Sequence, residues 1–210
     1  AEQVISTIPL TDMVSLAEPS APVQVRQAAD DLDFRGIVFV YLFLDRPPLA
    51  ADHWIYLPER GFVANRITEP VNFDASSAPA GKTVVCAEIT CTAGDRTWNT
   101  TDDVLAERVV HDLGKLGWTE VRPAQIIGVR TRRVREAYPV YRVGYREKLE
   151  RVMGWLGRFE NLQCIGRSAL FRYNNMDHSL EMGRRAAAVL LENRPRGWAA
   201  EVATGSGYFG

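Results

Sequence analysis

The spacing of hydrophobic residues along the chain predicts a series of short strands and amphipathic helices. Strands are expected at residues 4–8, 37–44, 53–59, 62–68, 82–92, 126–139 and 162–167. Helices are expected at residues 11–18, 22–32, 101–116, 145–159 and 177–193, where apolar positions recur every three or four residues. Arg60 and Gly61 separate two of the strands and predict a hairpin.

The order of these elements indicates an α+β fold rather than a regular alternation of strands and helices. Several strands follow one another at hairpin-like spacing, and we expect a mixed β-sheet flanked by helices. The run at 37–44 is continuously apolar but too short to cross a membrane. We therefore place it centrally in the sheet and expect it to be covered on both faces.

The balance of charges argues against nucleic acid as a partner. The 210 residues contain 25 Lys and Arg against 26 Asp and Glu, so no general attraction to phosphates is expected. The basic run at 130–135 alternates like a strand with a solvated face, an interpretation that we favour over a phosphate track. No apolar run reaches the roughly 20 residues of a membrane helix, and we expect a soluble cytoplasmic protein with no transmembrane segment.

The cysteines and histidines predict neither a disulfide framework nor a metal site. The three cysteines are odd in number and lack CxxC spacing. Cys86 and Cys91 would face opposite sides of one strand, where each acts as a small buried apolar residue. The three histidines have no spacing that suits metal ligands.

The sequence closes with GSGYFG at 205–210, which has the spacing of a dinucleotide-binding motif. That motif requires a following helix, whose N-terminal amides hold the pyrophosphate, and Gly210 is the last residue here. We therefore interpret residues 194–210 as a flexible tail. No serine lies in a GxSxG context, so catalytic residues are not assigned.

The stretch RYNNMDHSLEMGRRAA at 172–187 gathers polar residues at the predicted start of a helix. One interpretation is structural: Asn175 or Asp177 caps the helix, and Tyr173 and His178 pack on the surface. The other is functional, because a helix start offers free backbone amides and a positive dipole end to an anionic or electron-rich group.

The run GRSALFRYNNMDHSLEMGRRAA resembles the C-terminal flavin-binding motif of FAD-dependent oxidoreductases related to amine oxidases, protoporphyrinogen oxidases and phytoene desaturases. UDP-galactopyranose mutase has a similar pattern. AEQVISTIPL resembles the strand that precedes the family's crossing into the substrate domain, and YPVYRVGYREKLERV resembles the segment that returns from it.

The resemblance implies roles for seven residues. In such proteins a Gly-Arg pair approaches the FAD phosphates and ribitol, which implies this role for Gly166 and Arg167. The loop that opens the last helix contacts the isoalloxazine, which implies Asn175, Met176 and Asp177. Tyr173 and Asn174 would line the same pocket.

The resemblance also implies a domain organisation. Residues 1–30 and 141–193 correspond to returning pieces of an FAD-binding domain, and residues 31–140 correspond to the substrate domain. The family's N-terminal βαβ unit with its GxGxxG motif has no counterpart in these 210 residues, so we expect the C-terminal half of such an enzyme. This chain alone would then be inactive and would not retain FAD.

The expected activity of the full-length protein is FAD-dependent oxidation of a C–N or C–C bond in a small organic substrate. A flavin-dependent mutase and a non-catalytic module that binds a substrate or a partner are the alternatives. The substrate is expected to be largely apolar, because aromatic residues alternate at Phe39, Tyr41, Phe43, Trp54 and Tyr56. Core packing would also explain each of them. Apolar surface is expected to be left uncovered on the strand Val4–Ile8, on the strand Leu162–Ile165 and on the last helix around Leu180, Ala187 and Leu190, which predicts a homo-oligomer.

Overall fold

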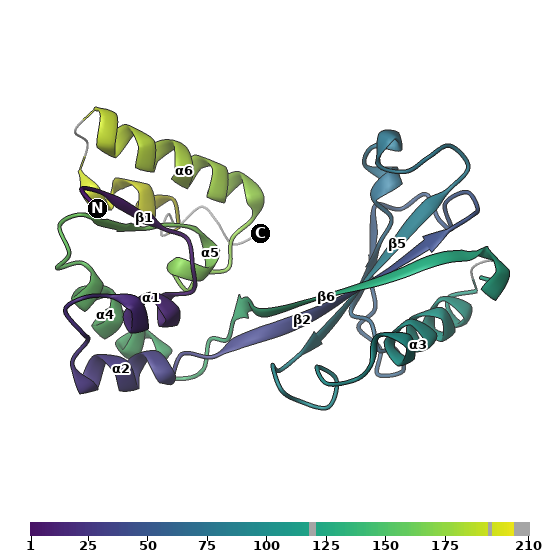
Figure 1. The fold of residues 1–210 in the computed structure, drawn as a ribbon, viewed down its shortest axis with the longest axis horizontal. Coiled ribbons are helices and arrows are strands. Elements are labelled where there is room, and N and C mark those ends of the chain that lie inside the picture. The colour runs from purple at the N-terminus through teal and green to yellow at the C-terminus, as the bar shows by residue number, and fades with distance from the viewer. Residues whose placement is uncertain (118–120, 193–194, 204–210) are drawn as a thin grey trace. The chain divides into compact units, whose positions relative to one another are not determined.

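The computed structural model describes residues 1–117, 121–192 and 195–203, and these form two compact units (Figure 1). The sheet unit contains residues 35–135. The terminal unit combines residues 1–34 with the residues from 136 onward. Strands β2 (Phe34–Leu44) and β6 (Ile126–Pro139) run from one unit into the other.

The sheet unit is built on a five-stranded sheet in the order β3-β4-β5-β2-β6. Strand β3 is Trp54–Tyr56, β4 is Arg66–Thr68 and β5 is Thr83–Cys91. The pairs β3–β4, β4–β5 and β5–β2 are all antiparallel. The described residues of this unit also form helix α3 and three short 3₁₀ helices, with bounds α3 Asp102–Lys115, η1 Pro70–Asn72, η2 Ala75–Ser77 and η3 Pro123–Gln125.

The two faces of this sheet differ in burial. Side chains alternate across a strand, so one face collects Val38, Val40 and Leu42 of β2, which pack in one hydrophobic cluster with Leu105 and Val109 of α3. The other face, which we call the open face, carries residues outside that cluster: Phe39, Tyr41, Phe43, Trp54, Tyr56, Arg66, Cys86 and Glu88.

The terminal unit combines a small parallel sheet with helices. Strand β1 (Val4–Ser6) pairs in parallel with β7 (Leu162–Cys164). The helices are α1 Leu10–Leu16, α2 Val23–Asp30, α4 Tyr145–Leu156, α5 Gly166–Ala169, α6 Met176–Leu191 and the 3₁₀ helix η4 Arg196–Ala203. Leu10, Val25, Val152 and Phe171 belong to one buried cluster, and Met182 of α6 belongs to a second.

The predicted α+β class is confirmed, and parallel and antiparallel pairs both occur, although in separate sheets. Strand β2 is internal, as expected. The prediction that both of its faces are covered holds for the face under α3, whereas the aromatic rings on the open face are only half-buried by the described residues. The hairpin of β3 and β4 is confirmed, with shorter strands. Within the segment expected to be a flexible tail, residues 196–203 form η4, and GSGYFG lies outside the described residues.

Candidate functional site

The candidate site begins where β7 ends and the chain turns into α5. Gly166 is the first residue of α5 and has a φ of +87°, a backbone conformation that glycine adopts without strain. No atom lies within 4 Å of the position that a Cβ would occupy on Gly166. The backbone at this turn can therefore be approached closely by another group.

Arg167 packs against aromatic rings and forms no ion pair with a described residue. Its guanidinium carbon lies 5.1 Å from the ring centroid of Tyr138 and 4.7 Å from that of Tyr173. The same side chain donates a hydrogen bond to the backbone carbonyl oxygen of Asn174. Arg167 thus connects α5 to the segment that leads into α6.

That segment is held by aromatic packing around Phe171. Phe171 is fully buried and has a φ of +49°, which is unusual for a residue with a side chain. Its ring contacts the rings of Phe34, Tyr141 and Tyr145, with centroids 5.0 to 6.2 Å apart. The backbone N–H of Tyr173 donates to the hydroxyl oxygen of Tyr141 at 2.6 Å. Packing of this kind sustains a backbone conformation that would otherwise cost free energy.

Asn174 is buried with its hydrogen-bonding capacity unused. Its side chain is 6% exposed, and neither the amide nitrogen nor the amide oxygen has a partner within the described residues. The hydroxyl of Ser6 on β1 and the amide oxygen of Gln163 on β7 are buried in the same condition. Buried polar atoms are seldom left unpaired in folded proteins, so Asn174 indicates a partner outside the described chain.

Helix α6 starts directly after Asn174 and is open to solvent at its first turn. Asn175 is the N-cap, and its backbone N–H donates to Nδ1 of His178 at 3.1 Å in a capping-box arrangement. Met176 is 78% exposed, and Asp177 is also exposed. The capping interpretation is therefore correct for Asn175 and wrong for Asp177, and His178 is buried rather than on the surface.

The structure brings most of the predicted site residues into one small region of the terminal unit. Arg167 contacts both Tyr173 and Asn174, Gly166 immediately precedes Arg167, and Asn175, Met176 and Asp177 form the start of α6. Sequence reasoning did not single out Tyr138 or Phe171 as supports of this region. The tyrosines clustered at 138–145 could have indicated this support. Their role became clear only from their contacts with α5 and with the segment before α6.

Cys164, which lies on β7 just before this region, is not a reactive thiol at neutral pH. Burial raises the pKa of the Cys164 thiol to about 11, so at neutral pH it is not a thiolate nucleophile. The described residues include no group of three His, Cys, Asp or Glu side chains that could hold a metal ion.

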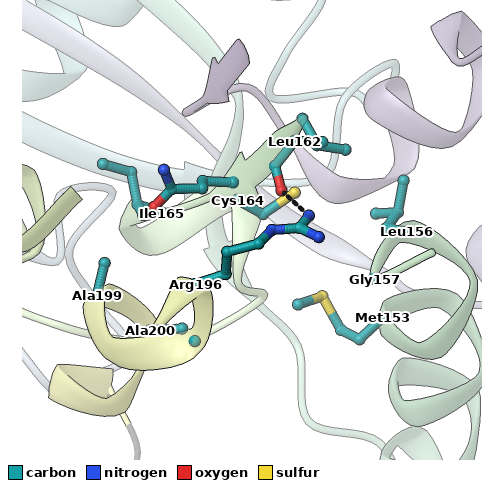
Figure 2. Close-up of a pocket in the computed structure, with 11 residues that line it drawn as sticks. Met153, Leu156, Gly157, Leu162, Cys164, Ile165, Arg196, Ala199 and Ala200 are labelled. Carbon is teal, nitrogen blue, oxygen red and sulfur yellow. Dashed lines mark hydrogen bonds between the residues drawn. The ribbon is translucent and has the colours of Figure 1, made fainter. Parts of the chain in front are cut away.

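A cavity of about 250 Å³ lies elsewhere in the terminal unit, between α4, β7 and η4 (Figure 2). Its lining is mostly apolar. Arg196 crosses it and donates to the backbone carbonyl oxygens of Phe159 and Leu162. The guanidinium group of Arg196 is therefore already hydrogen-bonded to the chain's own backbone. This makes the cavity a weaker candidate for a ligand site than the region around Asn174.

Residues 1–191 match the family model of flavin-containing amine oxidoreductases. The chain belongs to this family. Because its members are flavoproteins and oxidoreductases, the region built from Gly166 to Asp177 is to be compared with a flavin site.

Several solved structures have a similar fold. A reduced UDP-galactopyranose mutase matches with a TM-score of 0.76 at 20% identity, over 97% of this chain and 44% of that chain. A protein from Exiguobacterium sp. 255-15 described as a protoporphyrinogen oxidase matches with a TM-score of 0.58 at 21% identity, over 80% of this chain and 36% of that chain. A redesigned putrescine oxidase matches with a TM-score of 0.62 at 13% identity, over 92% and 43% of the two chains.

The chain spans less than half the length of these structures. At such low identities the likeness shows a shared fold. No curated protein matches the sequence. Among the described helices, none is long and apolar enough to cross a membrane.

The residues present fit one side of a flavin. Asn174 offers a buried amide with no partner among the described residues for its donor or its acceptor. The first turn of α6 begins with the exposed residues Met176 and Asp177, and the turn at Gly166 leaves room for close approach. A flavin ring carries both hydrogen-bond donors and acceptors, and its reduced form gains negative charge. These are the properties that an amide side chain and a helix N-terminus can match.

Proposed function

We propose that this chain supplies the isoalloxazine side of the FAD site, and the substrate domain, of a flavin-dependent oxidoreductase. The observation that carries the proposal is the buried, unpartnered amide of Asn174 beside the exposed start of α6. When bound, FAD would supply the redox chemistry by accepting a hydride equivalent from a C–N or C–C bond of an organic substrate. The family match supports a flavin, and the choice of bond is part of the proposal.

The residues of this chain would hold and orient the cofactor. Asn174 would hydrogen-bond the ring, and the backbone N–H groups of Met176 and Asp177 would stabilise negative charge near the helix start. Gly166 and Arg167 would lie toward the ribitol and phosphates. Arg167 also has a positioning role, because its contacts with Tyr173 and the carbonyl of Asn174 fix the segment that carries the amide.

The two compact units would have different roles in binding the cofactor and the substrate. Residues 1–30 and 141–193, which belong to the terminal unit, would contribute to the FAD-binding domain. Residues 31–140 would form the substrate domain around the five-stranded sheet. The half-buried or exposed rings on the open face favour substrate binding over core packing as their role, since none of them joins the cluster under α3.

Met176→Pro in the full-length protein tests the role of the helix start. Met176 is the first residue of α6, where proline is well tolerated, and Asn175 has φ −96° and ψ 178°, a conformation compatible with a following proline. The substitution therefore removes one exposed N–H and leaves the helix intact. We expect weaker FAD retention and a more negative midpoint potential, measured by absorbance at 450 nm during reductive titration.

Asp177→Ala is the matched comparison, because it changes an exposed side chain and keeps every backbone N–H. We expect it to shift the potential less than Met176→Pro does.

Asn174→Leu should lower FAD affinity by about tenfold or more, since a bound ring would lose hydrogen bonds to a buried amide. If the full-length protein contains no flavin, or if all three variants bind FAD like the parent at an unchanged potential, the proposal fails.

A further inference from the structure

The open face of the sheet unit carries two further arginines, Arg130 and Arg132, in addition to Arg66 and the aromatic rings. A Cβ on Gly128 of β6 would lie 3.6 Å from the ring of Phe43, and a Cβ on Gly36 would lie 3.2 Å from the carbonyl oxygen of Val134. Strands β2 and β6 are neighbours, so these two contacts make them antiparallel, with Gly128 on the same side as Phe43. Arg130 and Arg132 follow at intervals of two and therefore project from the open face.

Both arginines are exposed, and neither forms an ion pair with a described residue. Among the described residues, the side chain of Arg130 donates only to the backbone carbonyl oxygen of its neighbour Val129. By contrast, Arg133 projects from the other side of β6, where it bonds the carboxylate of Asp102 at the start of α3. Because side chains alternate along β6, Arg133 supports the start of α3, whereas Arg130 and Arg132 lie on the opposite face without an ion-pair partner among the described residues.

Two carboxylates on this face form ion pairs with basic side chains. Glu88 accepts two hydrogen bonds from Arg66, at 2.9 and 2.5 Å. Asp45, at the end of β2, pairs with Lys82 at 2.7 Å. Burial and the neighbouring Cys86 raise the pKa of Tyr41, so its hydroxyl stays neutral. The described open face therefore has a net positive charge beside aromatic rings.

We propose that the open face binds a small organic anion, whose apolar body lies on the rings of Phe39 and Tyr41 and whose negatively charged group is held by Arg130 and Arg132. The rings of Phe39 and Tyr41 are stacked, with centroids 6.3 Å apart and planes inclined by 21°, so they form one continuous apolar surface. The guanidinium fork suits a carboxylate or phosphate oxygen pair. That this anion is the substrate rests on the proposed flavin function, whereas its binding does not.

An amine is the substrate class that the family description suggests, and the open face is poorly suited to it. A cationic ammonium group requires a carboxylate or an uncovered aromatic cage, and the carboxylate of Glu88 is held by Arg66. Two unengaged arginines would repel the same ligand. We therefore expect the open face to distinguish ligands by their charge and to bind an anion more tightly than a cation.

Three naphthalene probes of nearly equal size test the proposal on the 210-residue chain. They are 2-naphthoate, neutral 2-naphthalenemethanol and cationic 2-naphthylmethylamine. We expect 2-naphthoate to bind at least about tenfold more tightly than the amine in calorimetric titration at pH 7, with the alcohol between them. Arg132→Gln and Arg130→Gln should each weaken naphthoate binding by about tenfold and leave the binding of the alcohol unchanged.

Arg60→Gln provides the control for the loss of one positive charge. Arg60 is exposed in the turn between β3 and β4, which Lys115 of α3 anchors through the carbonyl oxygen of Gly61. Its removal should leave naphthoate binding unchanged. The proposal is overturned if naphthoate does not bind, if the amine binds as tightly, or if Arg60→Gln weakens binding as much as Arg132→Gln. These titrations contain no flavin, so their failure is distinguishable from failure of the flavin assignment.

Discussion

Gly166 shows how one residue can set the course of the chain at the candidate site. Its φ of +87° turns β7 into α5, and no neighbouring atom would obstruct a methyl group there. An alanine at this position would therefore encounter backbone strain alone. Phe171, five residues later, also has a positive φ, and its burial among aromatic rings offsets the cost.

Gly166→Ala should lower the free energy of unfolding by about 1–2 kcal/mol because the left-handed conformation disfavours a Cβ. Gly183→Ala is the matched control: Gly183 lies inside α6, where an added methyl group would also meet no atom within 4 Å, and should gain about 1 kcal/mol from helix propensity. Urea unfolding of both variants measures the difference. Equal effects of the two substitutions would contradict the conformational argument.

At the scale of elements, a carboxylate helps to order the connection from β5 to α3. Asp95 accepts hydrogen bonds from the backbone N–H of Thr92 at 2.7 Å and of Trp98 at 2.8 Å. These bonds lower the pKa of Asp95 below its ordinary value, because they favour the charged form. The charged carboxylate of Asp95 therefore stabilises the loop before α3, and protonation at low pH removes this stabilisation.

The sign of the pH dependence follows from the lowered pKa. A carboxyl group that is more acidic in the folded state stabilises the fold above its unfolded pKa of about 4, and this contribution is lost as the pH falls through the folded value. Asp95→Ala should therefore lower the melting temperature at pH 7 and have much less effect near pH 2. Thermal unfolding of parent and variant at both pH values tests this, and an equal decrease at both would contradict it.

For the whole molecule, the terminal unit presents apolar side chains that its own elements do not cover. Ile5 on β1 and Met176, Leu180 and Leu191 on α6 are all exposed. Residues Leu162 and Ile165, by contrast, are buried. The two-stranded sheet of β1 and β7 is also smaller than parallel sheets generally are, which favours further pairing.

We expect the 210-residue chain to self-associate at micromolar concentration through this surface, as measured by sedimentation velocity. Leu180→Lys should reduce the association. Leu16→Lys, at an equally exposed position on α1, is the control and should have little effect. A concentration-independent monomer would show that the exposed side chains do not drive assembly.

Much of the local structure was predictable because periodicity acts over a few residues. Strand β6 was expected at its observed bounds, and α2, α3 and α6 were placed within a few residues of theirs. Asn175 was predicted as one of two possible caps from residue type. The family was recognisable from the run around Gly166 and Tyr173, since a sequence motif survives without knowledge of its contacts, and the family match confirms it.

The sequence by itself determined the α+β class, the main elements and the flavoprotein family. Tertiary structure alone decided which polar groups are satisfied: the amide of Asn174 is buried without a partner among the described residues, while Arg167 is engaged by Tyr138, Tyr173 and a backbone carbonyl. It also decided that Arg130 and Arg132 share a face with Tyr41, whereas Arg133 serves α3. Hydrogen bonding and charge pairing depend on distances between segments far apart in the chain, and periodicity carries no information about those distances.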